Sequence, residues 1–218
     1  MPPPIKIIIL GDSICFGQGV SLHKGWVTRL SAHLERFGQQ HQCQILLMNA
    51  SVNGNTTRLA LERMPYEVQS QHPDLLLVQF GMNDCNFWES DGGVPRVSRK
   101  AFSANLEEII ARGRCFGAKR IALNTNHPTT RTTLPLGPTS KPYQQWNAAY
   151  NQSIRDVASL HEDIVTLNDI ESSFEARLAD GARLEDYLLP DGLHLSEAGH
   201  EVYFQEVCRV IECMLLGL

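Results

Sequence analysis

The sequence lacks the features that mark membrane proteins and nucleic-acid-binding proteins. Its apolar runs all fall well short of the roughly 20 residues that span a bilayer. Lys and Arg form no cluster, and the 19 basic residues are outnumbered by 24 acidic ones, which gives a net charge of -5. We therefore expect no membrane span and no nucleic acid as the main partner.

The sequence also lacks a regular cysteine pattern. Its six cysteines are irregularly spaced and none forms a CxxC pair. This spacing favours free or buried thiols over a disulfide framework or a zinc site. The start, MPPPIKIII, has no basic segment followed by a long apolar one, as a signal peptide would. These features predict a cytoplasmic protein, and the chain implies neither a metal nor an organic cofactor.

The remaining composition is that of an ordinary globular protein, with 43% hydrophobic and 20% charged residues and a mean hydropathy of -0.19. We expect residues 1–218 to form one domain. Apolar β-branched runs alternate with amphipathic segments, which predicts a parallel sheet with helices on both faces. Strands are expected from Ile5 to before Gly11 and at 44–48, 75–80, 120–124 and 163–167, and helices at 25–37, 57–69, 102–114, 143–160, 170–179 and 197–216. Pro65 should kink or interrupt the second of these helices.

Polar residues that could take part in catalysis follow the predicted strands. GDS places Ser13 after the first strand, NGN places Gly54 after the second, and GMND places Asn83 after the third. DGLH, with Asp191 and His194, follows the last strand, so all four segments should meet at the carboxyl edge of the sheet. A serine, a histidine, a carboxylate and amide donors are the groups that acyl transfer requires.

Each of these residues also has an ordinary structural interpretation, such as a helix cap for Ser13 or a positive-φ turn for Gly54. Their joint occurrence favours catalysis, whereas Asp12 is expected only to shape the turn. Competing motifs are incomplete. The Gly17-Gln18-Gly19 segment lacks the third glycine of a dinucleotide loop, GxSxG is absent, and His200-Glu201 has no second histidine at helical spacing.

The ordered quartet Ser13, Gly54, Asn83 and His194, with Asp191 three residues before the histidine, resembles the GDSL family of the SGNH hydrolase superfamily. The resemblance extends from residue 7 to about residue 205. It implies a flavodoxin-like three-layer α/β/α sandwich around the five-stranded parallel sheet. It also implies that Ser13 is the nucleophile, His194 the base and Asp191 the orienting acid. The oxyanion donors would be the N–H groups of Ser13 and Gly54 and the side-chain amide of Asn83.

Two long loops, 85–97 and 127–142, follow strands and should therefore overhang the same edge. We expect them to contact the substrate through five side chains: Asn86, Phe87, Trp88, His127 and Arg131. Neither loop has a long apolar stretch, which favours esters of small acyl groups, including acetyl groups on a carbohydrate. Alternatives left open are a thioesterase or lysophospholipase, an acyltransferase with the same triad, and a catalytically inactive small-molecule binding module.

Overall fold

The computed structural model describes residues 3–131 and 142–218, and five parallel strands form its sheet. The strand order is β2-β1-β3-β4-β5, which is the flavodoxin-like order and confirms the predicted fold class. The strands are β1 (Ile5–Gly11), β2 (Ile45–Asn49), β3 (Leu75–Gln79), β4 (Arg120–Asn124) and β5 (Val165–Asn168).

Strand β1 lies inside the sheet and is covered on both faces. Ile7 and Ile9 point into one apolar core, while Ile8 and Leu10 point into the other, and all four are fully buried. A strand that is buried on both sides has no polar face, which explains why residues 7–10 of β1 form a continuous apolar run.

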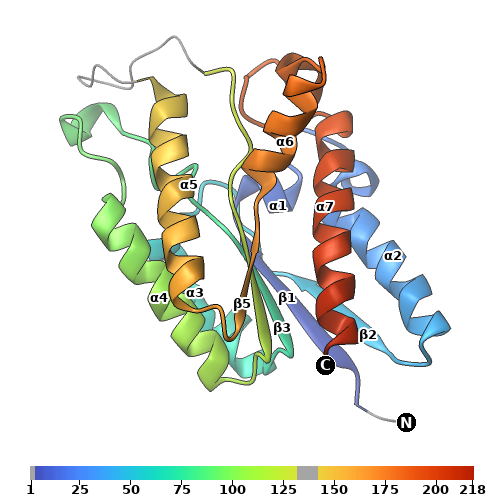
Figure 1. Cartoon of the computed structure of the whole chain (residues 1–218). Helices are drawn as coiled ribbons and strands as arrows, with labels where there is room; N and C mark the ends of the chain where they lie inside the picture. The colour runs from blue at the N-terminus through green and yellow to red at the C-terminus, as the bar shows by residue number, and fades with distance from the viewer. Residues whose placement is uncertain (1–2, 132–141) are drawn as a thin grey trace.

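Among the described residues, three helices of ten or more residues cover each face of the sheet (Figure 1). One face carries α2 (Trp26–Gln40), α6 (Ile170–Ala179) and α7 (Glu197–Leu216), and the other carries α3 (Thr57–Glu67), α4 (Arg99–Cys115) and α5 (Tyr143–Leu160). The chain runs from β1 outward to β2 and then returns to β3 on the other side of β1. Helix α2, which follows β1, and helix α4, which follows β3, therefore leave toward opposite faces. A crevice is expected between the ends of these two strands.

Several elements differ from the sequence-based expectation. Helix α3 continues past Pro65 and ends at Glu67, two residues before the predicted end, so the proline does not stop the helix at its own position. Helix α4 begins three residues earlier than expected, since the Ser98 hydroxyl caps it by accepting from the Ala101 N–H at 3.3 Å. Elements too short for a periodicity signal were not predicted: α1 (Ser13–Phe16) and the 3-10 helices η1 (Leu22–Lys24), η2 (Gln69–Gln71), η3 (Glu89–Asp91) and η4 (Leu184–Tyr187).

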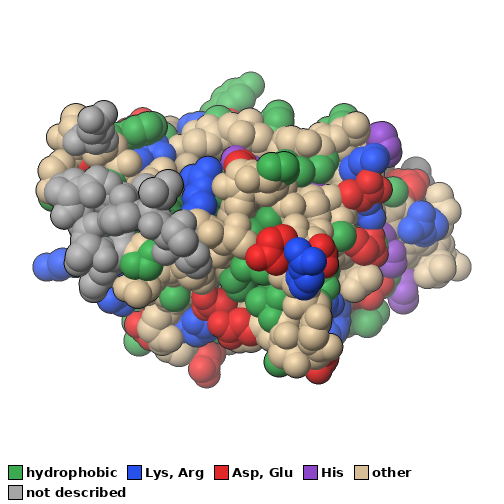
Figure 2. Space-filling model, turned by 90° about the horizontal axis from the view of Figure 1, so that it is seen from above, with side chains coloured by type: hydrophobic (Ala, Val, Ile, Leu, Met, Phe, Trp, Pro, Cys, Tyr) green, Lys and Arg blue, Asp and Glu red, His purple; other side chains and the backbone are tan. Residues whose placement is uncertain are grey.

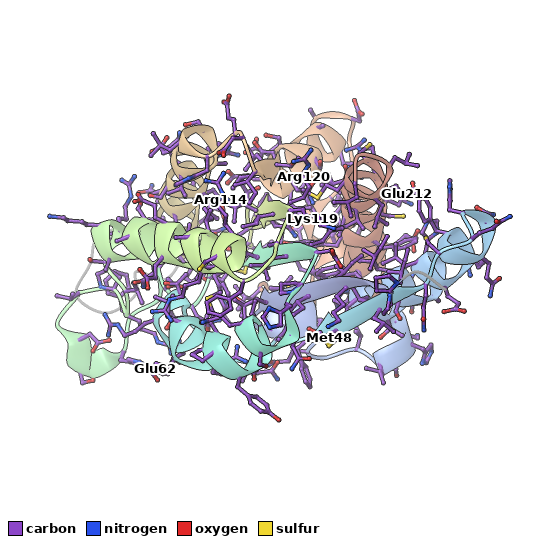
Figure 3. All side chains as sticks on the ribbon, turned by 90° about the horizontal axis from the view of Figure 1, so that it is seen from below. Met48, Glu62, Arg114, Lys119, Arg120 and Glu212 are labelled. Carbon is purple, nitrogen blue, oxygen red and sulfur yellow. The ribbon has the colours of Figure 1, made fainter. Side chains whose placement is uncertain are left out.

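The opposite edge of the sheet carries charged residues that tie loops to strand starts. Figure 3 shows Arg114, Lys119 and Arg120 near the amino ends of the strands. The Lys119 ammonium pairs with Asp74 at 2.9 Å, and Arg114 pairs with Asp163. None of the helices within residues 3–131 and 142–218 combines the length and the apolar character that crossing a bilayer requires.

We predict that Leu77→Ala in the middle of β3 lowers the free energy of unfolding by about 2–5 kcal/mol, because Leu77 is fully buried and its loss leaves a cavity. Leu46→Ala is the matched control, since Leu46 lies on strand β2 and is 40% exposed. It should cost only about 1 kcal/mol. Urea unfolding of both variants checks this, and equal losses would contradict the packing described for the sheet.

Candidate active site

Ser13 lies at the point where β1 turns into the short helix α1. Asp12 is the N-cap of this helix, and its Oδ1 accepts a hydrogen bond from the Ile14 N–H at 3.0 Å. Ser13 is thus the first helical residue, and it is only 6% exposed. The turn fixes the hydroxyl at the carboxyl edge of the sheet, beside the crevice between β1 and β3.

The structure brings Ser13, His194 and Asp191 into one hydrogen-bonded chain. Ser13 Oγ lies 3.0 Å from Nε2 of His194, although the two residues are 181 positions apart. Nδ1 of His194 lies 2.5 Å from Oδ2 of Asp191. The other oxygen of Asp191 accepts from the backbone N–H groups of Leu193 and His194, each at 2.9 Å.

The electrostatics of this chain favour one proton arrangement. Partial burial raises the pKa of the Asp191 carboxyl, but hydrogen bonds from the His194 ring and from two backbone N–H groups outweigh it, and the pKa lies below its ordinary value. An ionised Asp191 accepts a hydrogen bond from Nδ1 of His194, so the ring proton lies on Nδ1. The lone pair of Nε2 then faces the Ser13 hydroxyl, which is the arrangement a general base needs.

His127 lies beneath the turn that carries His194. It is fully buried, with Nε2 2.8 Å from the Leu193 carbonyl and Nδ1 3.1 Å from the Tyr203 hydroxyl. Burial lowers the pKa of His127 to about 4, so its ring is neutral, with Nε2 donating to Leu193 and Nδ1 accepting from Tyr203. The structure therefore assigns His127 to the support of this turn and gives it no surface for contact with a substrate.

Two further contacts hold the Asp191 turn from the side of the loop that follows β4. The Thr130 N–H donates to the Gly192 carbonyl at 3.1 Å, and Arg131 Nε donates to the Asp191 carbonyl at 3.0 Å. Gly192 has a φ of +68°, and a Cβ there would lie 2.4 Å from Thr130 Oγ1. Only glycine fits this close approach.

Asn83 and Gly54 lie beside the Ser13 turn. Nδ2 of Asn83 donates to Oδ2 of Asp12 at 3.2 Å, which joins the end of β3 to the end of β1. The Val52 N–H donates to the Gly11 carbonyl at 3.1 Å, which holds the Gly54 loop against the same strand end. Among the described residues, no acceptor is paired with the backbone N–H of Ser13 or of Gly54.

Two carboxyl groups, those of Asp12 and Asp84, are buried next to the turns that carry Ser13 and Asn83. Burial raises the pKa of Asp12 to about 7, and the nearby Asp84 carboxyl adds to the effect, while hydrogen bonds from Ile14 and Asn83 oppose it. Burial also raises the pKa of Asp84 to about 6 against two hydrogen bonds from Thr57, which come from its N–H at 2.9 Å and its hydroxyl at 2.6 Å. Asp12 therefore shapes the Ser13 turn, as expected, and in addition contacts Asn83.

Three of the expected substrate contacts lie in the loop after β3, and they differ in exposure. Trp88 is 56% exposed, whereas Phe87 is buried and packs edge-on against Trp146 with ring centroids 5.1 Å apart. Asn86 accepts the Phe87 N–H at 2.9 Å and so orders its own loop. Of the second loop, residues 132–141 lie outside the described residues.

Trp88 also lines an open hollow of about 350 Å³. Its walls come from the start of α3 and from the loop after β3: Thr56, Arg58, Leu59, Trp88, Asp91, Val94, Pro95 and Arg96. Figure 2 looks down on the carboxyl ends of the strands and shows acidic and basic side chains interspersed over this face. The surface around the site therefore carries no single sign of charge.

Arg96 is a site residue that the sequence did not indicate. Its guanidinium donates to the Gly54 carbonyl at 3.1 Å and lies 3.5 Å from Oδ1 of Asn83. It also lies over the Trp88 ring, 4.9 Å from the centroid. A single arginine in a long loop has no spacing pattern, so no sequence signal could have found it.

Comparisons with known proteins agree with this geometry. Residues 9–202 match the model of the GDSL-like lipase/acylhydrolase family. An arylesterase from Vibrio mimicus is 28% identical over 123 residues, which cover 56% of this chain and 56% of that protein. The chain thus spans about half the length of this relative.

Solved structures share the fold. A lipase/acylhydrolase from Enterococcus faecalis has a TM-score of 0.72 at 23% identity, and the match covers 96% of both chains. The acetylxylan esterase Axe2 from Geobacillus stearothermophilus has a TM-score of 0.74 at 20% identity, and the match covers 94% of this chain and 93% of that one.

The buried Asp12 carboxyl predicts a pH-dependent stability. Because its pKa in the folded protein is raised from 3.8 to about 7, its protonated form favours folding, and this contribution is lost as the pH rises from about 4 to about 7. Asp12→Asn cannot titrate. The free energy of unfolding of the variant minus that of wild type should therefore rise across this window and level off above it.

Urea unfolding at closely spaced pH values measures this difference. The loss of the Asn83 contact in the variant is independent of pH and shifts the whole curve without changing its shape. A flat difference between pH 4 and pH 7 would contradict the raised pKa.

Proposed function

Since the chain belongs to the GDSL-like lipase/acylhydrolase family, we propose that it is a serine esterase that cleaves carboxylic esters of small acyl groups. The observation that carries the proposal is the hydrogen-bonded chain from Ser13 Oγ through His194 to the Asp191 carboxylate. In this proposal Ser13 is the nucleophile, His194 the general base and acid, and Asp191 the group that orients the imidazole.

The reaction proceeds through an acyl-serine. Nε2 of His194 takes the proton of the Ser13 hydroxyl while Oγ attacks the acyl carbon, and the Asp191 carboxylate stabilises the imidazolium. His194 then gives this proton to the departing alcohol, which leaves the acyl group on Ser13. A water molecule, deprotonated by His194, attacks the ester in turn, and collapse of the second intermediate releases the acid and restores the serine.

The charge on the carbonyl oxygen is stabilised by three donors: the N–H groups of Ser13 and Gly54 and the side-chain amide of Asn83. The first two have no partner among the described residues, which leaves them available to the oxyanion. Asn83 uses one amide hydrogen on Asp12 and keeps the other. Loss of one such donor typically costs about 2.7–4 kcal/mol of transition-state stabilisation.

The substrate class is supported by the hollow that Arg96 lines, since the Arg96 guanidinium contacts Gly54 and Asn83. The exposed Trp88 ring gives it a flat apolar surface, and Arg58 and Asp91 add polar groups. An aromatic surface flanked by polar side chains suits a sugar or another small alcohol moiety. One similar protein is named an acetylxylan esterase, which agrees with a small acyl group on a carbohydrate, and another is named an arylesterase, which agrees with ester cleavage. Trp88, Arg131 and Asn86 remain the candidate contacts, with Trp88 the most exposed.

A cytoplasmic location is part of the same proposal. All six cysteines lie within the described residues and all are free, as thiols are in a reducing compartment. Detection of the native chain in the cytosolic fraction of its source cells would support this location, and recovery from the membrane or the medium would contradict it.

We expect Ser13→Ala and His194→Ala each to lower the turnover of p-nitrophenyl acetate at least about a thousandfold, because each removes a group through which both half-reactions pass. Asp191→Ala should lose less. Ser21→Ala and His23→Ala are matched controls, since both residues are exposed and lie outside the site, and they should keep full activity. Retained turnover in Ser13→Ala would refute the serine esterase, and a wild-type protein without turnover would favour a binding module.

A second measurement concerns the substrate. Turnover of p-nitrophenyl esters from acetate to decanoate should fall as the acyl chain lengthens, because no long apolar groove is expected near Ser13. A maximum at long chains would favour a lysophospholipase type of activity, and faster cleavage of acyl thioesters would favour a thioesterase. Ester products formed after adding glycerol or a sugar, without release of free acid, would identify an acyltransferase.

A further inference from the structure

The backbone of Arg96 is fixed at the end of the loop that follows β3. Its N–H donates to the Asn86 carbonyl at 2.8 Å, and the N–H of the next residue, Val97, donates to the Asp84 carbonyl at 3.1 Å. Val97 itself is buried in the core. These bonds close the loop on itself directly beside Asn83, so the Arg96 side chain starts from a defined position.

From this position the guanidinium contacts the acceptor oxygens of two of the three residues proposed as oxyanion donors. It donates to the Gly54 carbonyl at 3.1 Å, and it faces Oδ1 of Asn83 at 3.5 Å. The Trp88 ring, 4.9 Å away, limits the movement of its flat face. A guanidinium has five N–H donors in a rigid fork, so it can serve both oxygens at once.

The contact with Asn83 fixes which way its amide points. An asparagine side chain has an acceptor end and a donor end, and a half-turn exchanges them. Arg96 only donates, so it selects the oxygen on its side. The Asp12 carboxylate accepts from Nδ2 on the other side at 3.2 Å. Together the two neighbours hold the amide with its N–H groups toward Asp12 and the site.

The hydrogen bond to Gly54 holds a loop whose Gly54 has no side-chain packing of its own. Gly54 is exposed, has a φ of +76°, and a Cβ placed on it would meet no atom within 4 Å. Glycine in an unpacked turn has wide conformational freedom. The hydrogen bond from Arg96 to its carbonyl restricts the loop and thereby the direction of its N–H.

We propose that Arg96 is a positioning residue for the oxyanion hole, holding the Asn83 amide and the Gly54 loop in the orientation that receives the developing negative charge. This inference rests on the proposed esterase function. Positioned donors act on the transition state more than on the bound ester, so their loss should reduce kcat and leave KM nearly unchanged.

The kinetic test compares Arg96→Ala with Arg36→Ala on p-nitrophenyl acetate. Arg36 carries the same charge but is exposed on α2, outside the site and outside the hollow. Arg96→Ala should lower kcat about 10- to 100-fold with KM within about twofold. Arg36→Ala should keep the wild-type kcat. The unfolding midpoint in urea of each variant shows whether the fold is intact.

Arg96→Lys separates charge from shape. A lysine keeps the positive charge but presents a single ammonium in place of a planar fork, so it should restore only part of the lost kcat. It also keeps the experiment decisive if Arg96→Ala proves too unstable. Full activity in Arg96→Lys would overturn the positioning role, because charge alone would then suffice.

A double-mutant cycle with Asn83→Ala identifies the route of the effect. If Arg96 acts through Asn83, Arg96→Ala should cost clearly less in the Asn83→Ala background than in wild type. Equal losses in both backgrounds, a rise in KM alone, or unchanged kinetics would overturn the inference. An enzyme whose turnover does not depend on Ser13 would refute the proposed function instead, which keeps the two failures distinguishable.

Discussion

The 3.0 Å contact between Ser13 and His194 depends on the direction in which the sheet is wound. The chain leaves β1 for β2 and returns past β1 to β3, so the loops after β1 and β3 diverge to opposite faces. This reversal places the GDS and GMND turns side by side with room between them. The Asp191–His194 turn then closes over the same edge from the end of the chain. Without this winding order, the polar turns would remain separate.

The turns that carry the site residues rest on polar side chains that are buried. Asp12 and Asp84 are buried below the turns, and the desolvation of both carboxyls raises their pKa values. The cost is partly offset by backbone and hydroxyl donors that also fix the ends of β1 and α3. His127, neutral and fully buried, supports the His194 turn in the same way. The site is thus held by groups that never meet a substrate.

The sequence predicted the long elements well because their periodicity reflects burial directly. The helices 143–160, 170–179 and 197–216 and the strand 120–124 have the expected bounds. Shorter elements such as α1, which has four residues, make little more than one helical turn and so show no repeating pattern. The cap at Ser98 shifted the start of α4. Pro65 did not stop α3 at its own position, and the helix ends two residues after it, at Glu67.

For the site, the sequence by itself determined which chemical groups are available and that they follow strand ends: Ser13, Gly54, Asn83, Asp191 and His194. Only the tertiary structure decided what surrounds them. It buried His127 and Phe87, left Trp88 exposed, and placed Arg96 between Gly54 and Asn83. Strand ends are local features that periodicity and turn chemistry encode. Contacts such as those of Arg96 join segments 13 and 42 positions apart, and their geometry arises only when the whole sheet is assembled.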